Sequence, residues 1–322
     1  MKTVTACTMD CPDACSLVVW RDAAGEIKIS GNPDHPVTAG FTCAKIKRLP
    51  RRLRHPQRIV QPMIRSANRW QTIAWDEALD LCAEKIDRLR AEPAAILHFH
   101  GEGAKGVLKQ ANKLFFALLG ASRTRGSLCD AAGFVAFLHD FGSRCNHGIA
   151  DLVNARRIIN WGKDLAGSSV HLAAMVRKAA AAGARTLTIS PGGDESRYPA
   201  DHHIRIRPGT DRFLAAAVLR LLVAENQLSG HIRDHTRRWP SFRNAIFKYP
   251  PEELAARCDV PPADIRRLGE AYLDGPAATI VGGGLQRYRY GGENVRFINA
   301  LALLSGNIGR AGGGVYFHHH SL

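Results

Sequence analysis

The sequence contains no apolar run that approaches the ~18 residues a membrane-spanning helix needs. Its first ten residues, MKTVTACTMD, also lack the apolar stretch of a secretory leader, so we expect a cytoplasmic protein with no membrane span. In a reducing compartment its eight cysteines are not expected to form structural disulfides. With 322 residues and 45% hydrophobic content, the chain is long enough to bury a core without such links.

Acidic residues are scarce: there are 29 Asp and Glu against 44 Lys and Arg, a formal net charge of +15. Nucleic acid is one possible partner for a basic chain. However, the one dense basic run, residues 45–54, has no interleaved aromatic residues. A phosphate-rich cofactor explains the excess positive charge equally well, as does the absence of acidic parts of the molecule from this chain. We therefore expect no nucleic-acid partner.

Three of the eight cysteines lie close together near the N-terminus, and a fourth follows after 27 intervening residues: Cys7, Cys11, Cys15 and Cys43. Four thiolates on short loops can hold a zinc ion or a [4Fe–4S] cluster. Zinc sites of four cysteines usually come as two close pairs, so the three-plus-one spacing favours iron–sulfur. The alternative, a set of buried thiols, fits poorly with the polar residues between the first three cysteines.

The segments around these cysteines predict a small β-rich structure. Residues 16–22 and 26–30 alternate or run apolar, with a turn at Ala24–Gly25, which is typical of an antiparallel hairpin. Residues 31–40 then form a long turn that leads back to Cys43. Lys45 follows Cys43 by two residues, and it is either a functional residue beside the cluster or one more surface lysine.

The rest of the chain alternates between short apolar runs and helical patterns. The apolar runs are 94–100, 155–162, 184–190 and 277–284, and helical patterns include 167–184 and 210–227. This alternation predicts an α/β fold with parallel sheets. Ligands of such sheets bind beyond the carboxyl ends of the strands, which is where Gly162, Pro191–Gly192 and Gly282–Gly284 fall.

Several segments resemble one known family. The N-terminal CTMDCPDACSLVV and GNPDHPVTAGFTCAK are similar to the start of the molybdopterin oxidoreductases, also called the dimethyl sulfoxide reductase family. The likeness continues in the family's order over all 322 residues, through RLRHPQRIVQPMIR, WQTIAWDEALDLCAEKI, IINWGKDLAGSSVH, TISPGGDES, IRPGTDRFLAA and GGGLQRYRYGGENVRFINALALLSGNIGRAGGGV.

The resemblance implies two cofactors. One is a [4Fe–4S] cluster held by the four N-terminal cysteines, and Lys45 matches the lysine between cluster and pterin, although Ile46 replaces the glycine that often follows. The other is molybdenum or tungsten held by two molybdopterin guanine dinucleotides. Asp211 would receive the guanine amino groups, unless it or Thr210 only caps a helix. The expected dinucleotide contacts are Trp161, Gly162, Ser190, Pro191, Gly192, Pro208, Gly209, Asp211, Gly283, Gly284 and Gln286.

The resemblance also implies a protein ligand to the catalytic metal in the segment RGSLCDAAGF, residues 125–134. Cys129 is the candidate because a soft thiolate suits such a metal. Ser127 and Asp130 are the nearby alternatives, and a buried thiol is the bland interpretation of Cys129. Cys82, by contrast, shares a helical face with apolar residues, so we expect it in the core.

The resemblance implies three domains: an iron–sulfur domain at 1–58, a first Rossmann-like unit from 59–142 plus 277–322, and a second from 143–276. In this division residues 277–284 pair with 94–100, and the family's C-terminal β domain is absent. We expect a molybdenum- or tungsten-dependent oxidoreductase subunit with a small-molecule substrate and an electron-transfer partner subunit, with a second chain as one source of the missing domain. The alternative is a truncated iron–sulfur electron-transfer or assembly protein without catalytic metal.

Overall fold

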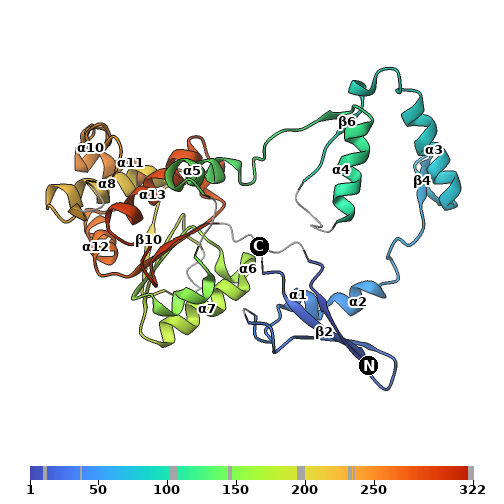
Figure 1. Ribbon diagram of the computed structural model, residues 1–322, viewed down its shortest axis with the longest axis horizontal. Coiled ribbons are helices and arrows are strands. Elements are labelled where there is room, and N and C mark those ends of the chain that lie inside the picture. The colour runs from blue at the N-terminus through green and yellow to red at the C-terminus, as the bar shows by residue number, and fades with distance from the viewer. Residues whose placement is uncertain are drawn as a thin grey trace. The chain divides into compact units, whose positions relative to one another are not determined.

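The computed structural model describes residues 1–9, 13–36, 38–101, 107–143, 147–193, 200–230, 234 and 236–317. Of the expected site residues, Cys11 lies outside these ranges. The chain divides into two compact units, Met1–Gly126 and Ser127–Leu322 (Figure 1).

The first unit begins with a three-stranded antiparallel sheet in the order β1–β2–β3. Its strands are β1 (Lys2–Ala6), β2 (Ser16–Arg21) and β3 (Ile27–Gly31). The β2–β3 turn is closed by the Asp22 carboxylate, which accepts hydrogen bonds from the backbone N–H groups of Ala24 and Glu26 at 3.0 and 2.9 Å. Gly25 adopts φ +75°, which glycine does without steric cost. The hairpin expected from the sequence is thereby confirmed.

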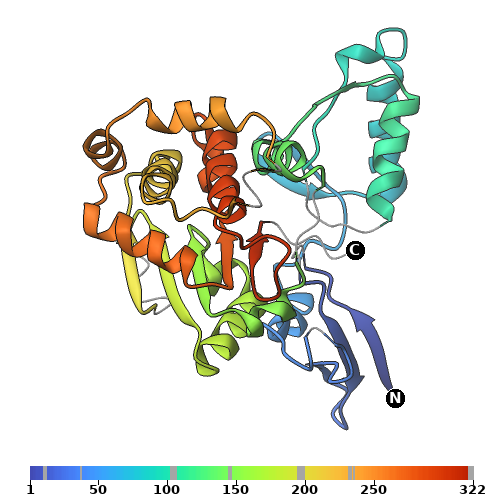
Figure 2. The same cartoon turned by 60° about the vertical axis from the view of Figure 1, so that its left-hand side comes forward.

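Two short helices follow this sheet, α1 (Ala44–Lys47) and α2 (Leu49–Leu53), and Figure 2 shows them beside its strands. Ile46 on α1 is buried together with Leu17 and Cys15, and Leu49 packs against the same cluster. Within the described part of the chain, this core has only three buried residues. Because each fully buried large apolar side chain contributes only about 1.5–3 kcal/mol, the core adds little to the free energy of unfolding.

The remainder of the first unit buries few side chains. It contains the hairpin β4 (Met63–Ser66) and β5 (Arg69–Thr72), the helices α3 (Trp75–Asp87) and α4 (Leu108–Leu118), a 3-10 turn η1 (Pro93–Ala95), and β6 (Leu97–His98), which pairs in parallel with β7 (Ser122–Arg123). Neither α3 nor α4 contains a buried residue. Cys82 is exposed, so its expected core position is wrong. An amphipathic pattern shows which face of a helix is apolar, not whether another element covers it.

The second unit is built on a five-stranded parallel sheet in the order β10–β9–β8–β11–β12. The strands are β8 (Arg157–Trp161), β9 (Arg185–Ser190), β10 (His202–Arg205), β11 (Ala277–Val281) and β12 (Gly314–Tyr316). Strands that alternate with helices form this sheet, which confirms the α/β fold class.

Helices cover both faces of this sheet, and successive strand residues point into different cores. On one face Ile158 and Ile280 pack with Leu172 and Val176 of α7 (Val170–Ala181), near η2 (Ile149–Asn154) and α6 (Leu165–Ser168). On the other face Ile159 packs in a larger core. That core is formed with α5 (Ala131–Phe141), α8 (Asp211–Ala224), α10 (Trp239–Phe247), α11 (Pro251–Cys258), α12 (Pro262–Leu273) and α13 (Gly291–Leu304).

The position of β11 corrects the expected domain division. Residues 277–281 pair with β8 in parallel, with Thr279 opposite Ile159. Among the described residues β6 pairs with β7 instead, so the expected pairing of 277–284 with 94–100 is wrong. All five residues of β11 are buried, and an apolar strand of this kind fits equally well between any two strands of a parallel sheet. Within the described ranges, no helix is long and apolar enough to cross a membrane.

Candidate cofactor and metal-binding site

Cys7 and Cys15 lie at one end of the β1–β2 strand pair. Cys7 follows β1 and donates its backbone N–H to the carbonyl of Cys15 at 2.8 Å, just before β2. Its sulfur accepts a hydrogen bond from the N–H of Met9 at 3.4 Å. Cys43 is the N-cap of α1, and all three cysteines are free thiols. Within the described ranges no group of three metal-ligating side chains is gathered tightly enough to hold a metal ion.

Lys45 lies on α1, two residues after Cys43, and is exposed. Its neighbour Ile46 is buried in the small core. The isoleucine therefore anchors α1 on the sheet, and Lys45 projects from a fixed turn of helix.

In the second unit the glycine-rich loops meet at the carboxyl edge of the sheet. Gly162 donates its N–H to Ile189 at 2.8 Å, and Gly282 donates to Trp161 at 2.8 Å. A Cβ atom on Gly282 would lie 2.0 Å from the carbonyl oxygen of Gly162, so only glycine fits where these loops touch. Gly284, by contrast, faces open space, because nothing lies within 4 Å of the position of its absent Cβ. The backbone at this edge is thus open to a ligand.

Two more predicted loops lie at the same edge. Ser190 ends β9 and accepts a hydrogen bond from the N–H of Gly192 through its hydroxyl, at 3.2 Å. Pro208 and Gly209 precede α8, and Gly209 has φ +75° with the ring of Tyr288 packed against it. Pro191 and Pro208 are exposed. These loop residues therefore lie at the ends of the strands or just beyond them.

Asp211, the first residue of α8, is a buried carboxyl group at this edge. It is 5% exposed, and its Oδ1 accepts a hydrogen bond from the indole Nε1–H of Trp161 at 2.8 Å. Burial raises the pKa of Asp211 to about 6, although the bond from Trp161 opposes this. The helix has no side-chain cap, and the Thr210 hydroxyl donates to the carbonyl of Arg207. Capping by Thr210 is therefore not observed. Trp161 is fully buried, so its side chain contacts Asp211 and the core.

Asn294 is a further residue of this edge that the sequence did not single out. It is completely buried on α13. Its amide donates to the carbonyls of Gly209 and Leu285 at 3.4 and 3.2 Å, and its oxygen accepts from the N–H of Arg212 at 3.2 Å. Asn294 thus joins the loop before α8 to the loop after β11. Nothing in the sequence distinguishes Asn294 from the other polar residues of α13, Glu293, Arg296 and Asn299.

Cys129 precedes α5 and is exposed, with Sγ accepting a hydrogen bond from Arg287 Nη2 at 3.1 Å. Its backbone carbonyl also accepts from Arg287 Nε at 3.1 Å and from the side-chain amide of Gln286. Gln286, which is 3% exposed, accepts from the N–H of Gly133 at 3.1 Å. Phe134 is buried in the larger core, but Cys129 is exposed and is not part of that core. Cys129 is therefore not a packed core thiol. Its loop is instead fastened to the segment that follows β11.

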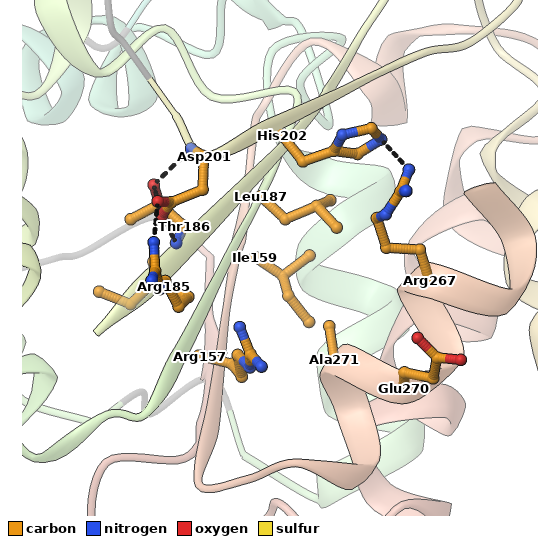
Figure 3. Close-up of a pocket in the computed structure, with 11 residues that line it drawn as sticks. Arg157, Ile159, Arg185, Thr186, Leu187, Asp201, His202, Arg267, Glu270 and Ala271 are labelled. Atoms are coloured by element: carbon orange, nitrogen blue, oxygen red, sulfur yellow. Dashed lines mark hydrogen bonds and ion pairs between the residues drawn. The ribbon is translucent and has the colours of Figure 1, made fainter. Parts of the chain in front are cut away.

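A separate cavity of about 140 Å³ lies at the opposite, amino-terminal edge of this sheet (Figure 3). Its basic side chains are paired: Arg185 with Asp201 at 2.9 Å, and Arg267 with Asp264 at 2.8 Å. Arg157 likewise donates to an acidic residue of the α12–β11 connection. Because these cations are neutralised, the cavity offers little to an anionic ligand, and we place the candidate site at the carboxyl edge.

Comparisons with known proteins agree with this arrangement. The family model "Molybdopterin oxidoreductase Fe4S4 domain" matches residues 1–55, and "Molybdopterin oxidoreductase" matches residues 58–321. "Probable oxidoreductase YyaE" of Bacillus subtilis (strain 168) is 32% identical over 317 residues, covering 97% of this chain and 48% of the relative. "Probable dimethyl sulfoxide reductase chain YnfF" of Escherichia coli (strain K12) is 27% identical over 360 residues, covering 96% of this chain and 43% of the relative.

Among solved structures, acetylene hydratase from Pelobacter acetylenicus superimposes with a TM-score of 0.80 at 19% identity, over 96% of this chain and 44% of that chain. At this identity the likeness concerns the fold alone. The chain spans about half the length of the relatives it matches. Because the two family models together match nearly every residue, the chain belongs to the molybdopterin oxidoreductase family.

Proposed function

We propose that this chain is part of a molybdenum- or tungsten-dependent oxidoreductase acting on a small substrate. The observation that carries the proposal is the exposed Cys129 thiol, held on a loop that is fastened to the glycine-rich carboxyl edge of a parallel sheet. When bound, a bis(molybdopterin guanine dinucleotide) metal centre supplies two-electron redox chemistry and a [4Fe–4S] cluster supplies one-electron transfer.

The residues of the second unit fit a pterin-linked dinucleotide. Bare backbone at Gly284 allows close approach of phosphate. The buried Asp211 carboxyl group has a second oxygen beyond the one bound by Trp161, and it suits a base that carries amino donors. Cys129 offers a thiolate, which is a soft donor suited to a metal of this class. In this proposal Gly162, Pro191, Gly192, Pro208, Gly209 and Gly283 also line the dinucleotide site.

The first unit fits a cluster by its donor set. Cys7, Cys15 and Cys43 are free thiols near a small apolar core, and apolar surroundings with hydrogen bonds to sulfur are typical of such sites. Cys11 is the fourth proposed ligand and lies outside the described residues. Lys45, two residues after Cys43, is the proposed relay residue toward the pterin. An electron-transfer partner subunit would exchange electrons with this unit.

Metal and cofactor analysis of anaerobically purified protein tests the proposal. We expect about four iron atoms per chain together with molybdenum or tungsten, and pterin fluorescence after oxidative extraction. Zinc alone would rule the proposal out. The same extract should yield a guanine nucleotide after acid hydrolysis, since the dinucleotide form carries one.

A second candidate is an iron–sulfur electron-transfer or assembly protein without catalytic metal. The observation that favours it is that Cys7, Cys15 and Cys43, three of the four proposed cluster ligands, all lie in the first compact unit. It predicts iron without molybdenum, tungsten or pterin. In the leading proposal the remaining part of the fold is supplied by further polypeptide, in the same or a second chain, and adding the corresponding half of a relative should increase cofactor retention. In the second candidate that addition changes nothing.

A further inference from the structure

We infer that Arg287 is a positioning residue for Cys129, which it holds through its guanidinium group while placing a positive charge beside the thiol. The role of this contact at a metal rests on the proposed function. The contact itself involves only this chain.

The geometry of the contact is a two-point clamp. Arg287 Nη2 donates to Sγ of Cys129 at 3.1 Å, and Nε of the same side chain donates to the Cys129 carbonyl at 3.1 Å. A guanidinium group presents its donors in a rigid planar fork. Two bonds from one fork to one residue therefore fix both the backbone and the sulfur of Cys129.

The preceding residue supports the clamp from inside the protein. The Gln286 amide donates to the Cys129 carbonyl and accepts from the N–H of Gly133, at the start of α5. Gln286 is nearly fully buried, whereas Arg287 is exposed. The buried amide thus anchors the loop, and the exposed guanidinium is left to act on the thiol. A loop of several exposed residues would otherwise be free to turn the sulfur away.

Such a group should also influence a metal bound to the sulfur. Hydrogen bonds to a ligating atom orient it and change its donor strength. An N–H···S bond from a cation draws electron density away from a thiolate. In the loaded protein, Arg287 would therefore alter the electronic signature of a metal held by Cys129.

The first test measures local charge in the full chain, produced without molybdate or tungstate. Iodoacetate and iodoacetamide attack the same thiolate, so the ratio of their rates at Cys129 is independent of the fraction of thiol ionised. That ratio reports the charge felt by the anionic reagent. We expect Arg287→Gln to lower it about threefold at low ionic strength, the effect of one charge at roughly 6 Å in water.

Arg289→Gln is the matched control. Arg289 is also exposed, carries the same charge, and stacks on Tyr290 rather than contacting Cys129. Arg289→Gln should leave the rate ratio at Cys129 nearly unchanged. Neither variant should change the rate ratio at the exposed Cys82, whose labelled peptide is resolved from that of Cys129 by mass spectrometry. Arg287→Lys should restore the ratio. Equal ratios at Cys129 in wild type, Arg287→Gln and Arg289→Gln would overturn the inference.

The second test uses metal-loaded protein. Arg287→Gln should shift the electron paramagnetic resonance signature of the molybdenum or tungsten centre, while Arg287→Lys and Arg289→Gln keep it closer to wild type. An unchanged signature in Arg287→Gln would refute the role at the metal. If the protein binds neither metal but the labelling ratio falls as expected, the proposed function fails while the clamp on Cys129 stands.

Discussion

Replacing Asp211 by asparagine is expected to stabilise the protein at neutral pH. Asp211 is buried, and its pKa is raised from the usual 3.8 to about 6, mainly by the loss of hydration of its charged form. At pH 7 the carboxylate is ionised in an environment that disfavours the charge. Asparagine keeps an oxygen that can accept the hydrogen bond from Trp161, now at 2.8 Å, but has no charge to bury.

The magnitude follows from the two pKa values. A separation of about two pH units corresponds to about 3 kcal/mol at about 1.4 kcal/mol per unit. Because the folded-state pKa lies above the unfolded one, the contribution of Asp211 to wild-type stability is most favourable below about pH 4 and decreases until about pH 6. This pKa already includes the favourable interactions of the carboxylate with Trp161, with the backbone N–H at the start of α8 and with Arg212. The net gain for Asp211→Asn is therefore about 3 kcal/mol at pH 7.

The assay is urea unfolding of the cofactor-free chain between about pH 4.5 and pH 7.5. The difference in unfolding free energy between Asp211→Asn and wild type should grow with pH and level off above about pH 6.5. A variant that is less stable at pH 7, or a difference independent of pH, would refute the reasoning. In the loaded protein Asp211→Asn should retain less guanine dinucleotide. The Asp211 carboxylate would then lower the free energy of unfolding but contribute to cofactor binding.

Three further predictions concern other parts of the chain. Asp201 accepts hydrogen bonds from Thr186, and these lower its pKa. Asp201→Asn should therefore destabilise the protein by roughly 1 kcal/mol above about pH 4, and this loss should disappear on acidification. Urea unfolding at several pH values should show this change in stability, which is opposite in sign to that of Asp211→Asn. Gly282→Ala should lower the thermal midpoint by several degrees, corresponding to about 1–3 kcal/mol, because its Cβ would meet Gly162 backbone; calorimetry showing an unchanged midpoint would contradict the close approach. Cys129→Ser should abolish or redirect turnover and change the metal's spectrum but not the [4Fe–4S] signal, with stability within about 0.5 kcal/mol of wild type because the thiol is exposed.

Much of the second unit could be predicted from the sequence because its strands are buried on both faces. Such strands appear as short runs rich in apolar residues, as in residues 158–161 and 277–281, and the glycines after them fall at the carboxyl edge as expected. The order of the strands could not be predicted. An apolar strand offers the same backbone hydrogen-bonding groups along both of its edges, so its sequence does not specify the neighbouring strands. Nothing in residues 277–281 distinguishes β8 from β6 as a neighbour.

Individual contacts of the site depended on long-range packing. Asp211 was a candidate on its motif, but its bond to Trp161 joins residues 50 positions apart. Arg287 looks like an ordinary solvated arginine in the sequence, and only the fold brings it to Cys129. Asn294 was missed for the same reason. The expected core position of Cys82 is wrong because helical periodicity is a local property that does not show whether another element covers the apolar face.

The part of the first unit that contains α3 and α4, neither of which has a buried residue, affects how cooperatively the chain unfolds. Trp70 and Trp75 are more than 60% exposed, and Leu118 on α4 is 80% exposed. Few buried apolar contacts mean that little free energy opposes local opening. Amide hydrogens of α3 and α4 should therefore exchange with solvent through sub-global openings, long before those of β8 and β11. A protease should accordingly cut first within residues 59–126, leaving the five-stranded sheet intact.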